Sequence, residues 1–281
     1  MKEILIECVQ SVLQGDSVPT ELVIVDQSDA PQETLAAQET DRDCRIRYLS
    51  TQTVGVGRAR NAAIAAAQHD IIVLIDDDEV VSVDWFGTLV RALINSGQRS
   101  VVTGKVLPTK AETPGGFAPS TKADEPSAVY EGRVGDVLYT GNMAMYRSAL
   151  DEVGAFDERL GPGTSFPAAE DNDFGFRLLE AGYRIIYVPE AIVYHRSWRT
   201  ERNYLRLRWN YGRGQGAFFA KYLSLRDRHM MWRLLKSLKH HVWGFALHIR
   251  RQRRLAYGHG IYVLGLLSGA AEWLLTQRKT P

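Results

Sequence analysis

The stretch from Ile71 to Glu79 constrains the fold of this chain more than any other. It reads Ile-Ile-Val-Leu-Ile-Asp-Asp-Asp-Glu. Five consecutive aliphatic residues are too apolar to face water on either side, which predicts a strand buried in a parallel sheet. Asp76, Asp77 and Asp78 follow where the strand ends, and this is where open α/β sheets bind ligands. A divalent cation would offset the repulsion between these carboxylates, whereas a solvated acidic loop is the alternative.

Strand-like and helix-like segments alternate over the first two thirds of the chain. Glu21–Asp26 is a second apolar run that ends in an aspartate, and Tyr183–Val188 has strand character as well. Trp85–Ile94 has the spacing of an amphipathic helix. The alternation predicts an α/β fold with a mostly parallel sheet flanked by helices.

A glycine-bearing loop precedes the predicted helix Ala59–Gln68. Gly55-x-Gly57 lacks the third glycine of a dinucleotide-binding fingerprint, so we reject that interpretation. Arg58 and Arg60 lie where the helix begins, which suits an anionic ligand. A solvated pair of arginines is the alternative.

The charge is distributed unevenly along the 281 residues, although the net charge is only +1. Residues 1–195 hold 16 Lys and Arg against 30 Asp and Glu, and residues 196–281 hold 18 against 3. We therefore predict two parts, a catalytic domain over 1–195 and a basic helical region over 196–281. The basic part would meet an anionic partner such as membrane lipid, nucleic acid or a polyphosphate.

The two cysteines give an expectation about the compartment. Cys8 and Cys44 are far apart and match neither a zinc-binding spacing nor a redox pair, so we expect reduced thiols. No signal peptide is recognisable at Met1. Both points favour a location on the cytoplasmic side, in solution or peripheral to the membrane.

Seven short motifs occur in order between Glu21 and His195, and together they resemble the inverting family 2 glycosyltransferases of the GT-A fold. The motifs are Glu-Leu-Val-Ile-Val-Asp-Gln-Ser, Gly-Arg-Ala-Arg-Asn-Ala-Ala, Val-Leu-Ile-Asp-Asp-Asp-Glu, Tyr-Thr-Gly-Asn-Met-Ala, Val-Gly-Ala-Phe-Asp-Glu-Arg-Leu-Gly, Ala-Glu-Asp-Asn-Asp-Phe-Gly-Phe-Arg-Leu and Tyr-Val-Pro-Glu-Ala-Ile-Val-Tyr-His. The resemblance implies transfer of a sugar from a nucleotide-diphosphate sugar to an acceptor hydroxyl. It also implies a role in cell-envelope polysaccharide or glycolipid synthesis, with a lipid-linked acceptor as one option.

The resemblance also implies which residues bind the donor. Asp26 would contact the base ring, or would simply cap a turn. The other implied donor contacts are Arg58, Arg60, Asp76, Asp77, Gly141 and Asn142.

The same resemblance implies a metal site and a general base. Asp78, with Asp76 and His195, would hold Mn²⁺ or Mg²⁺, because hard carboxylates suit these ions. Asp171 would be the general base and Glu170 its neighbour that assists it. Alternatively, His195 is structural and both acids cap the following helix.

Two other classes of function fit parts of the sequence. Asp76 and Asp78 fit the nucleophile motif of haloacid-dehalogenase-like phosphatases, but the downstream Gly-Asp-x-x-x-Asp pair is missing from the sequence. A non-catalytic, membrane-associated binding protein on the same fold is the second alternative. We expect no nucleic acid partner, and homo-oligomerisation stays open.

The basic region contains an apolar helical stripe between Met231 and Ile249, surrounded by Lys and Arg. Such a helix either packs internally or lies in a membrane interface. Ile261–Leu275 is too short to span a bilayer. Gly212-Arg-Gly-Gln-Gly216 is expected to break a helix, whereas Gly265-x-x-x-Gly269 could let two helices approach closely.

The start of the sequence gives one further expectation. The resembled family begins with a buried central strand, but Met1 stands about where the helix after that strand should begin. We expect this strand to be missing. Glu21–Asp26 and Ile71–Ile75 would then either pair directly or leave open edges.

Overall fold

The computed structural model describes residues 2–30, 35, 43–110, 114, 116–123, 126–196, 199–223 and 227–277. It divides into two compact units. The first unit comprises Met1–Val54, Arg58–Phe156 and Phe174–Arg199, and the second comprises Gly55–Gly57, Asp157–Asp173 and Thr200–Pro281. The functional division expected after residue 195 stays a prediction.

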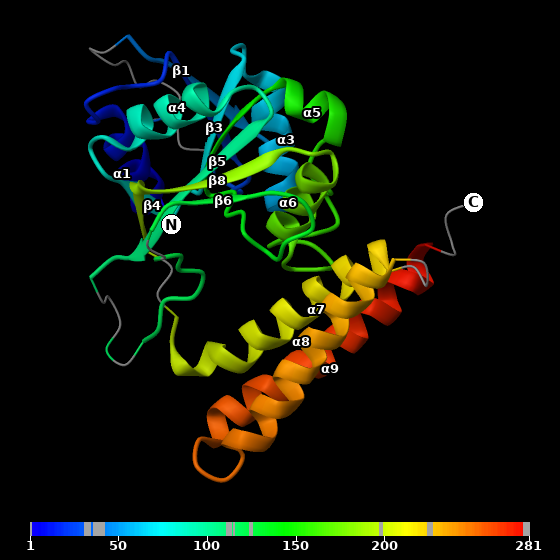
Figure 1. Cartoon of the computed structure of the whole chain (residues 1–281). Coiled ribbons are helices and arrows are strands. Elements are labelled where there is room, and N and C mark those ends of the chain that lie inside the picture. Colours follow the sequence, from blue (N-terminus) through cyan, green and yellow to red (C-terminus); the bar gives the residue numbers. More distant parts are fainter. Residues whose placement is uncertain are drawn as a thin grey trace. The chain divides into compact units, whose positions relative to one another are not determined.

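Strands and helices alternate through the described part of the first unit, as the sequence pattern predicts (Figure 1). The elements up to the second unit's helices are, in chain order, α1 Lys2–Leu13, β1 Glu21–Asp26, β2 Arg45–Ser50, α3 Val56–Ala66, β3 Ile71–Ile75, β4 Glu79–Val81, α4 Trp85–Ser96, β5 Ser100–Pro108, β6 Ala128–Tyr130, β7 Asn142–Tyr146, α5 Ser148–Val153, α6 Glu170–Glu180 and β8 Arg184–His195.

Helices cover both faces of the larger sheet. Alternate side chains of each strand point to opposite faces, so one strand contributes to the core on both sides. Val101 of β5 packs with α3, α5 and α6 in one core cluster. Its neighbour Val102 packs with α1 and α4 in the other. The predicted α/β class is therefore confirmed.

The sheet is mixed rather than mostly parallel, so that part of the prediction is wrong. The six-stranded sheet has the order β3-β7-β5-β8-β4, with β6 paired to β8. Among the described strand pairs only β1–β2 and β5–β8 are parallel. Burial on both faces makes β3 apolar whichever way its neighbour β7 runs, and the two strands are antiparallel.

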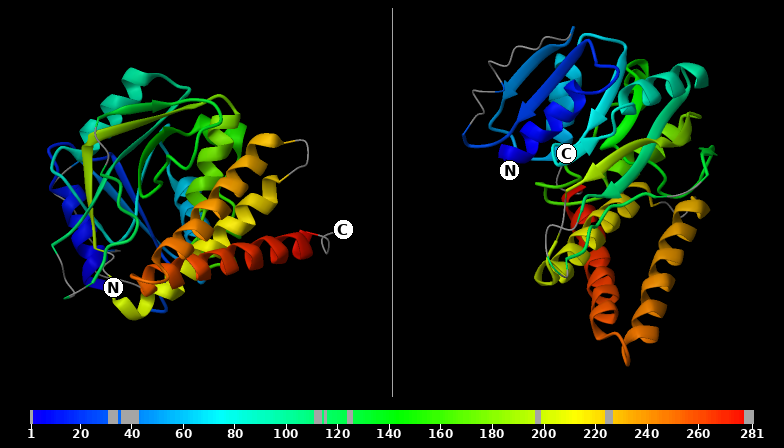
Figure 2. Two further views of the ribbon diagram at one scale, coloured as in Figure 1. Left: turned by 60° about the horizontal axis from the view of Figure 1, so that its bottom comes forward. Right: turned by 90° about the vertical axis from the view of Figure 1, so that its left-hand side faces the viewer.

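β1 and β3 do not pair with each other. β1 and β2 form a separate two-stranded sheet, seen in blue in Figure 2. Of the two expected alternatives for these strands, direct pairing is therefore excluded in the described chain. The expected missing strand itself stays a prediction.

Three long helices dominate the second unit: α7 Tyr204–Tyr222, α8 Arg228–His248 and α9 Arg253–Gln277, preceded by a short 3₁₀ turn, η1 Glu201–Asn203. The expected break at Gly212–Gly216 is wrong, since α7 continues through it. A Cβ at Gly216 would lie 2.0 Å from the carbonyl oxygen of Leu266, and one at Gly269 would lie 2.1 Å from that of Arg213. These glycines bring α7 and α9 into backbone contact.

In the described chain, none of the helices combines the length and the apolar character required to cross a bilayer.

Candidate functional site

The acidic cluster occupies the turn between β3 and β4. Asp76, Asp77 and Asp78 follow the last residue of β3, and Glu79 begins β4. β4 pairs antiparallel with the end of β8, which sets Glu79 opposite His195 in the register. This pairing brings residues distant in the sequence to one edge of the sheet.

Asp78 and His195 are in direct contact. Nε2 of His195 lies 3.2 Å from Oδ1 of Asp78, and His195 is buried. Burial acts to raise the pKa of Asp78, but the hydrogen bond and charge of His195, followed by the charge of Arg199, outweigh it and lower that pKa. Asp78 is therefore held as a carboxylate. Arg199 was not among the predicted site residues, because nothing in the local sequence connects it to this turn.

Asp76 is paired with Arg60. The guanidinium of Arg60 is buried, lies over the ring of Phe156 at 5.5 Å and donates to Oδ1 of Asp76 at 2.7 Å. Gly141 leaves room for this carboxylate, since a Cβ there would lie 2.5 Å from Oδ2 of Asp76. Three predicted donor-site residues thus meet at one point.

Two carboxyl groups in the cluster have raised pKa values. Asp77 is exposed as a residue, yet desolvation of its carboxyl group, followed by the charges of Asp78 and Asp76, raises its pKa to about 6. Burial, followed by the charge of Asp76, raises the pKa of Glu79 well above its usual range. Glu79 accepts hydrogen bonds from the hydroxyl of Tyr139 at 3.1 Å and from the amide of Asp76 at 3.2 Å. Glu79 was not among the predicted site residues, although it directly follows the three aspartates.

Asp26 lies at the end of β1 in the other sheet of the first unit. It is buried and accepts hydrogen bonds from the amide of Ser28 at 2.8 Å and from the hydroxyl of Tyr48. The bond from Ser28 closes a turn after the strand, so Asp26 caps this turn as one of the two expectations proposed. Arg58 is exposed and donates to the carbonyl of Val54 at 2.9 Å.

Asn142 is enclosed by protein. Its amide nitrogen donates to the carbonyls of Lys105 and Ala191, both at 3.0 Å, and its oxygen accepts from the indole of Trp85 at 2.8 Å. These bonds hold β5, β7, β8 and α4 together. A direct contact with a donor stays a prediction for this residue.

Asp78 and His195 suit a divalent cation. A carboxylate oxygen from the turn before β4 and an imidazole nitrogen from the end of β8 are ligand types that Mn²⁺ accepts. Asp76 does not join them in a cluster of three ligand atoms in the described chain, because it turns toward Arg60. Two of the three predicted ligands are therefore together, and bound phosphate or water would supply the remaining coordination positions.

Glu170 and Asp171 lie in the second unit, at the start of α6. The preceding Ala169 has a φ of +72°, a left-handed conformation that is strained for a residue with a Cβ. Gly161 has a φ of +95°, which favours glycine, and a Cβ there would lie 2.9 Å from the carboxyl carbon of Glu170. Both carboxylates thus belong to the first turn of α6.

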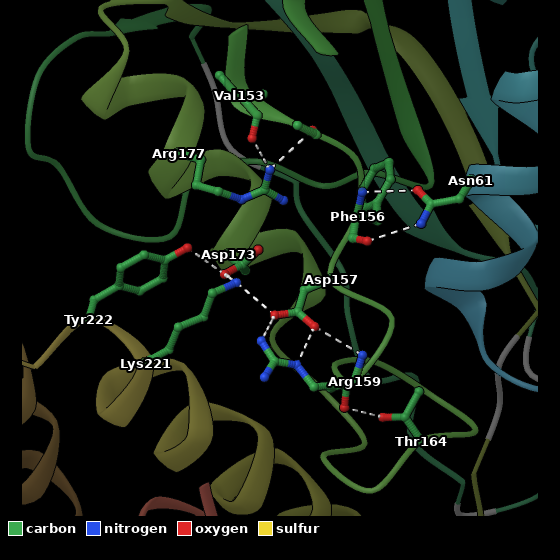
Figure 3. A network of polar contacts seen from close by, with 11 residues as sticks. Asn61, Val153, Phe156, Asp157, Arg159, Thr164, Asp173, Arg177, Lys221 and Tyr222 are labelled. Atoms are coloured by element: carbon green, nitrogen blue, oxygen red, sulfur yellow. Dashed lines mark hydrogen bonds and ion pairs between the residues drawn. The ribbon is translucent and has the colours of Figure 1, made fainter. Parts of the chain in front are cut away.

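The first turn of α6 is tied to α7 by side chains (Figure 3). Lys221 lies between two carboxylates, 2.5 Å from Oδ1 of Asp173 and 2.8 Å from Oδ2 of Asp157. The Tyr222 hydroxyl donates to Asp173 at 2.7 Å. Burial acts to raise the pKa of Asp157, but the bonds from Arg159 and Lys221 lower it below its usual range.

The chain is similar to known proteins over most of its length. A family model described as "Glycosyltransferase like family 2" matches residues 1–212. An N-acetylglucosaminyltransferase of Rhizobium meliloti is 29% identical over 238 residues, which is 77% of this chain and 54% of that protein. The chain thus spans about half the length of this relative.

Two further similarities concern one segment and the fold. An N-acetylglucosaminyl-diphospho-decaprenol L-rhamnosyltransferase of Mycobacterium tuberculosis is 36% identical over 92 residues, 31% of this chain and 25% of that protein. The structure of the mannosyltransferase PcManGT of Pyrobaculum calidifontis was solved in complex with GDP-Man and Mn²⁺. It superposes on this chain with a TM-score of 0.62 at 16% identity, and the match covers 97% of this chain and 84% of the mannosyltransferase chain. The latter likeness supports the predicted fold.

Proposed function

Because this chain belongs to glycosyltransferase family 2, we propose that it transfers a sugar from a nucleotide-diphosphate sugar to an acceptor hydroxyl with inversion at the anomeric carbon. The observation that carries the proposal is the convergence of Asp76, Asp78, Arg60 and His195 where β3 and β4 meet the end of β8. A cluster with this composition suits a diphosphate together with a cation.

Each residue of the cluster has a proposed task. Asp78 and His195 would hold Mn²⁺ or Mg²⁺, which supplies charge that neutralises the leaving diphosphate. Arg60 orients Asp76, and Arg199 adds positive charge beside Asp78. Asp26, fixed by Tyr48, is the proposed contact for the base ring.

Asp171 is the proposed general base. Inversion requires a carboxylate beside the acceptor hydroxyl, on the side opposite the departing diphosphate. Asp171 would accept the hydroxyl proton as the oxygen forms its bond to the anomeric carbon and the bond to the diphosphate oxygen breaks. Glu170 would bind the acceptor or raise the pKa of Asp171.

The acceptor is proposed to be a lipid-linked hydroxyl compound of the cell envelope. The diphospho-decaprenol in the name of the mycobacterial relative supports this class. The family assignment argues against the phosphatase alternative. Whether the chain is an enzyme or a non-catalytic binding protein is decided by the assay below.

The test measures release of nucleoside diphosphate from a panel of nucleotide sugars with Mn²⁺, with and without an extract of envelope lipids. We expect release with at least one donor, and a fall of about 10²–10⁴-fold in Asp171→Asn, which keeps the shape of the side chain but accepts no proton. Donor affinity should be unchanged in this variant. Donor binding without turnover in the wild type would favour the non-catalytic alternative, and normal turnover in Asp171→Asn would reduce Asp171 to a helix cap.

A further inference from the structure

The α8–α9 hairpin exposes large apolar side chains around its tip. Val242 is 59% exposed, Trp243 65% and Leu247 57% near the end of α8, and Tyr257 is 50% and Leu264 57% exposed near the start of α9. The side of α8 that contacts its neighbours is different and includes Met230, His241 and Gly244. The apolar stripe predicted from the sequence is therefore not covered at Val242 in this structure.

Positive charge is concentrated at the same end of the hairpin. Arg250, Arg251 and Arg253 lie in and beside the connection between the two helices, seen in orange in Figure 1, and the neighbouring Arg254 is paired with Glu201. Glu272 is the single acidic residue in the sequence from 228 to 277, and it is paired with Arg213. The hairpin tip, defined here as residues 242–264, thus combines exposed apolar side chains with a concentration of positive charge.

This combination decides between two kinds of partner. The core of a protein interface is depleted of charge, and a second copy of this hairpin would bring arginines against arginines. An anionic bilayer surface offers negative head groups to the arginines and an acyl boundary to the apolar side chains, and Trp and Tyr are enriched at such interfaces.

We propose that the hairpin tip binds the surface of an anionic lipid bilayer and lies in the interface without spanning the membrane. Trp243 and Leu247 enter the boundary between head groups and acyl chains, and Arg250 and Arg251 contact lipid phosphates. The chain is then a peripheral membrane protein, and this inference is independent of the proposed transfer reaction.

Flotation of the full chain with lipid vesicles tests the proposal. We expect binding to vesicles of phosphatidylcholine mixed with phosphatidylglycerol, weakened by high salt, and little binding to phosphatidylcholine alone. Arg250→Gln/Arg251→Gln should lower partitioning about 30-fold at low salt, about 5-fold for each arginine. Trp243→Ala/Leu247→Ala should lower it about 10-fold or more.

Val129→Ala is the matched control, because Val129 is as exposed as Leu247 but lies on β6, away from the hairpin in sequence. It should bind like the wild type, and circular dichroism checks that every variant is folded. Equal binding to neutral vesicles, no binding to either, or wild-type binding by both double variants would overturn the proposal. Self-association that both double variants abolish, without vesicle binding by the wild type, would instead identify the tip as an interface between copies.

Discussion

Oδ1 of Asp173 lies 2.5 Å from Nζ of Lys221, which pairs a fully buried carboxylate in the first turn of α6 with a cation from the last turn of α7. Asn172 adds a second link, from its amide to Oε1 of Gln215 at 2.7 Å. The two residues that follow Asp171 are thus both fastened to α7. The position of the proposed general base depends on these links.

Lys221→Met keeps much of the side-chain volume but leaves Asp173 without its cation. Breaking a buried pair in this way should lower the free energy of unfolding by about 3 kcal/mol. Lys221→Arg should recover part of the loss. Urea denaturation measures both, and Arg133→Met is the control, because its pair with Glu180 is exposed and should contribute less than about 1 kcal/mol. Equal losses in the two methionine variants would contradict a special role for Lys221.

Arg60→Met removes the partner of Asp76. The side chain of Asp76 is 28% exposed, so water compensates in part and we expect a loss of about 1–2 kcal/mol in unfolding free energy. Donor affinity should fall as well, because Asp76 loses its fixed orientation. Arg58→Met is the comparison: Arg58 is exposed and its hydrogen bond goes to the carbonyl of the exposed Val54, so its loss should change stability little. Wild-type donor affinity in Arg60→Met would show that the ion pair serves the fold alone.

His241 makes the second unit sensitive to acid. Burial, followed by the charges of Arg208, His240 and His259, lowers its pKa to about 3. Its ring also lies 3.8 Å from that of Tyr262, centroid to centroid. The unfolded chain binds a proton near the ordinary pKa of about 6.5 and the folded chain does not. Stability contributed by the neutral ring is therefore complete above that pH and is lost as the pH falls toward 3.

The difference between wild type and His241→Phe isolates this contribution. Between pH 7 and pH 5 the wild type should lose about 1–2 kcal/mol more unfolding free energy than the variant. Parallel curves for the wild type and His241→Phe would contradict this account.

Gly216→Ala tests the close contact of α7 and α9. The added Cβ would meet the backbone of Leu266, which cannot move without separating the helices, so we expect a loss of about 2–3 kcal/mol. Gly260→Ala is the control in α9, since its Cβ would meet only the ring of Phe245 at 3.3 Å, and that ring is partly exposed. Thermal unfolding measures both variants. Equal midpoints would mean that the helices tolerate a wider separation.

These glycines illustrate what could not be predicted from the sequence. A helix-breaking tendency is local, whereas the contact of Gly216 with α9 depends on a helix about 50 residues later. The apolar run Ile71–Ile75 correctly predicted a buried strand, but burial on both faces carries no information on strand direction, and the expected parallel pairing was wrong for β3.

The sequence also predicted part of the candidate site but not all of it. Asp78 and His195 were paired in advance by the family resemblance, and the antiparallel contact of β4 with β8 brings them together. Arg199 and Glu79 were missed, because their influence on the cluster depends on three-dimensional proximity and burial. The predicted roles of Glu170 and Asp171 stay predictions.

Metal-dependent binding of a nucleotide sugar tests the central claim most directly. Isothermal titration of the wild type and Asp78→Ala with the best donor of the panel, in Mn²⁺ and again in EDTA, is the decisive measurement. We predict binding by the wild type in Mn²⁺, a loss of affinity of about 100-fold or more in EDTA, and the same loss in Asp78→Ala although the variant stays folded. Equal donor affinity in Mn²⁺ and EDTA, or wild-type affinity in Asp78→Ala, would contradict the assignment of this cluster as a metal-assisted donor site.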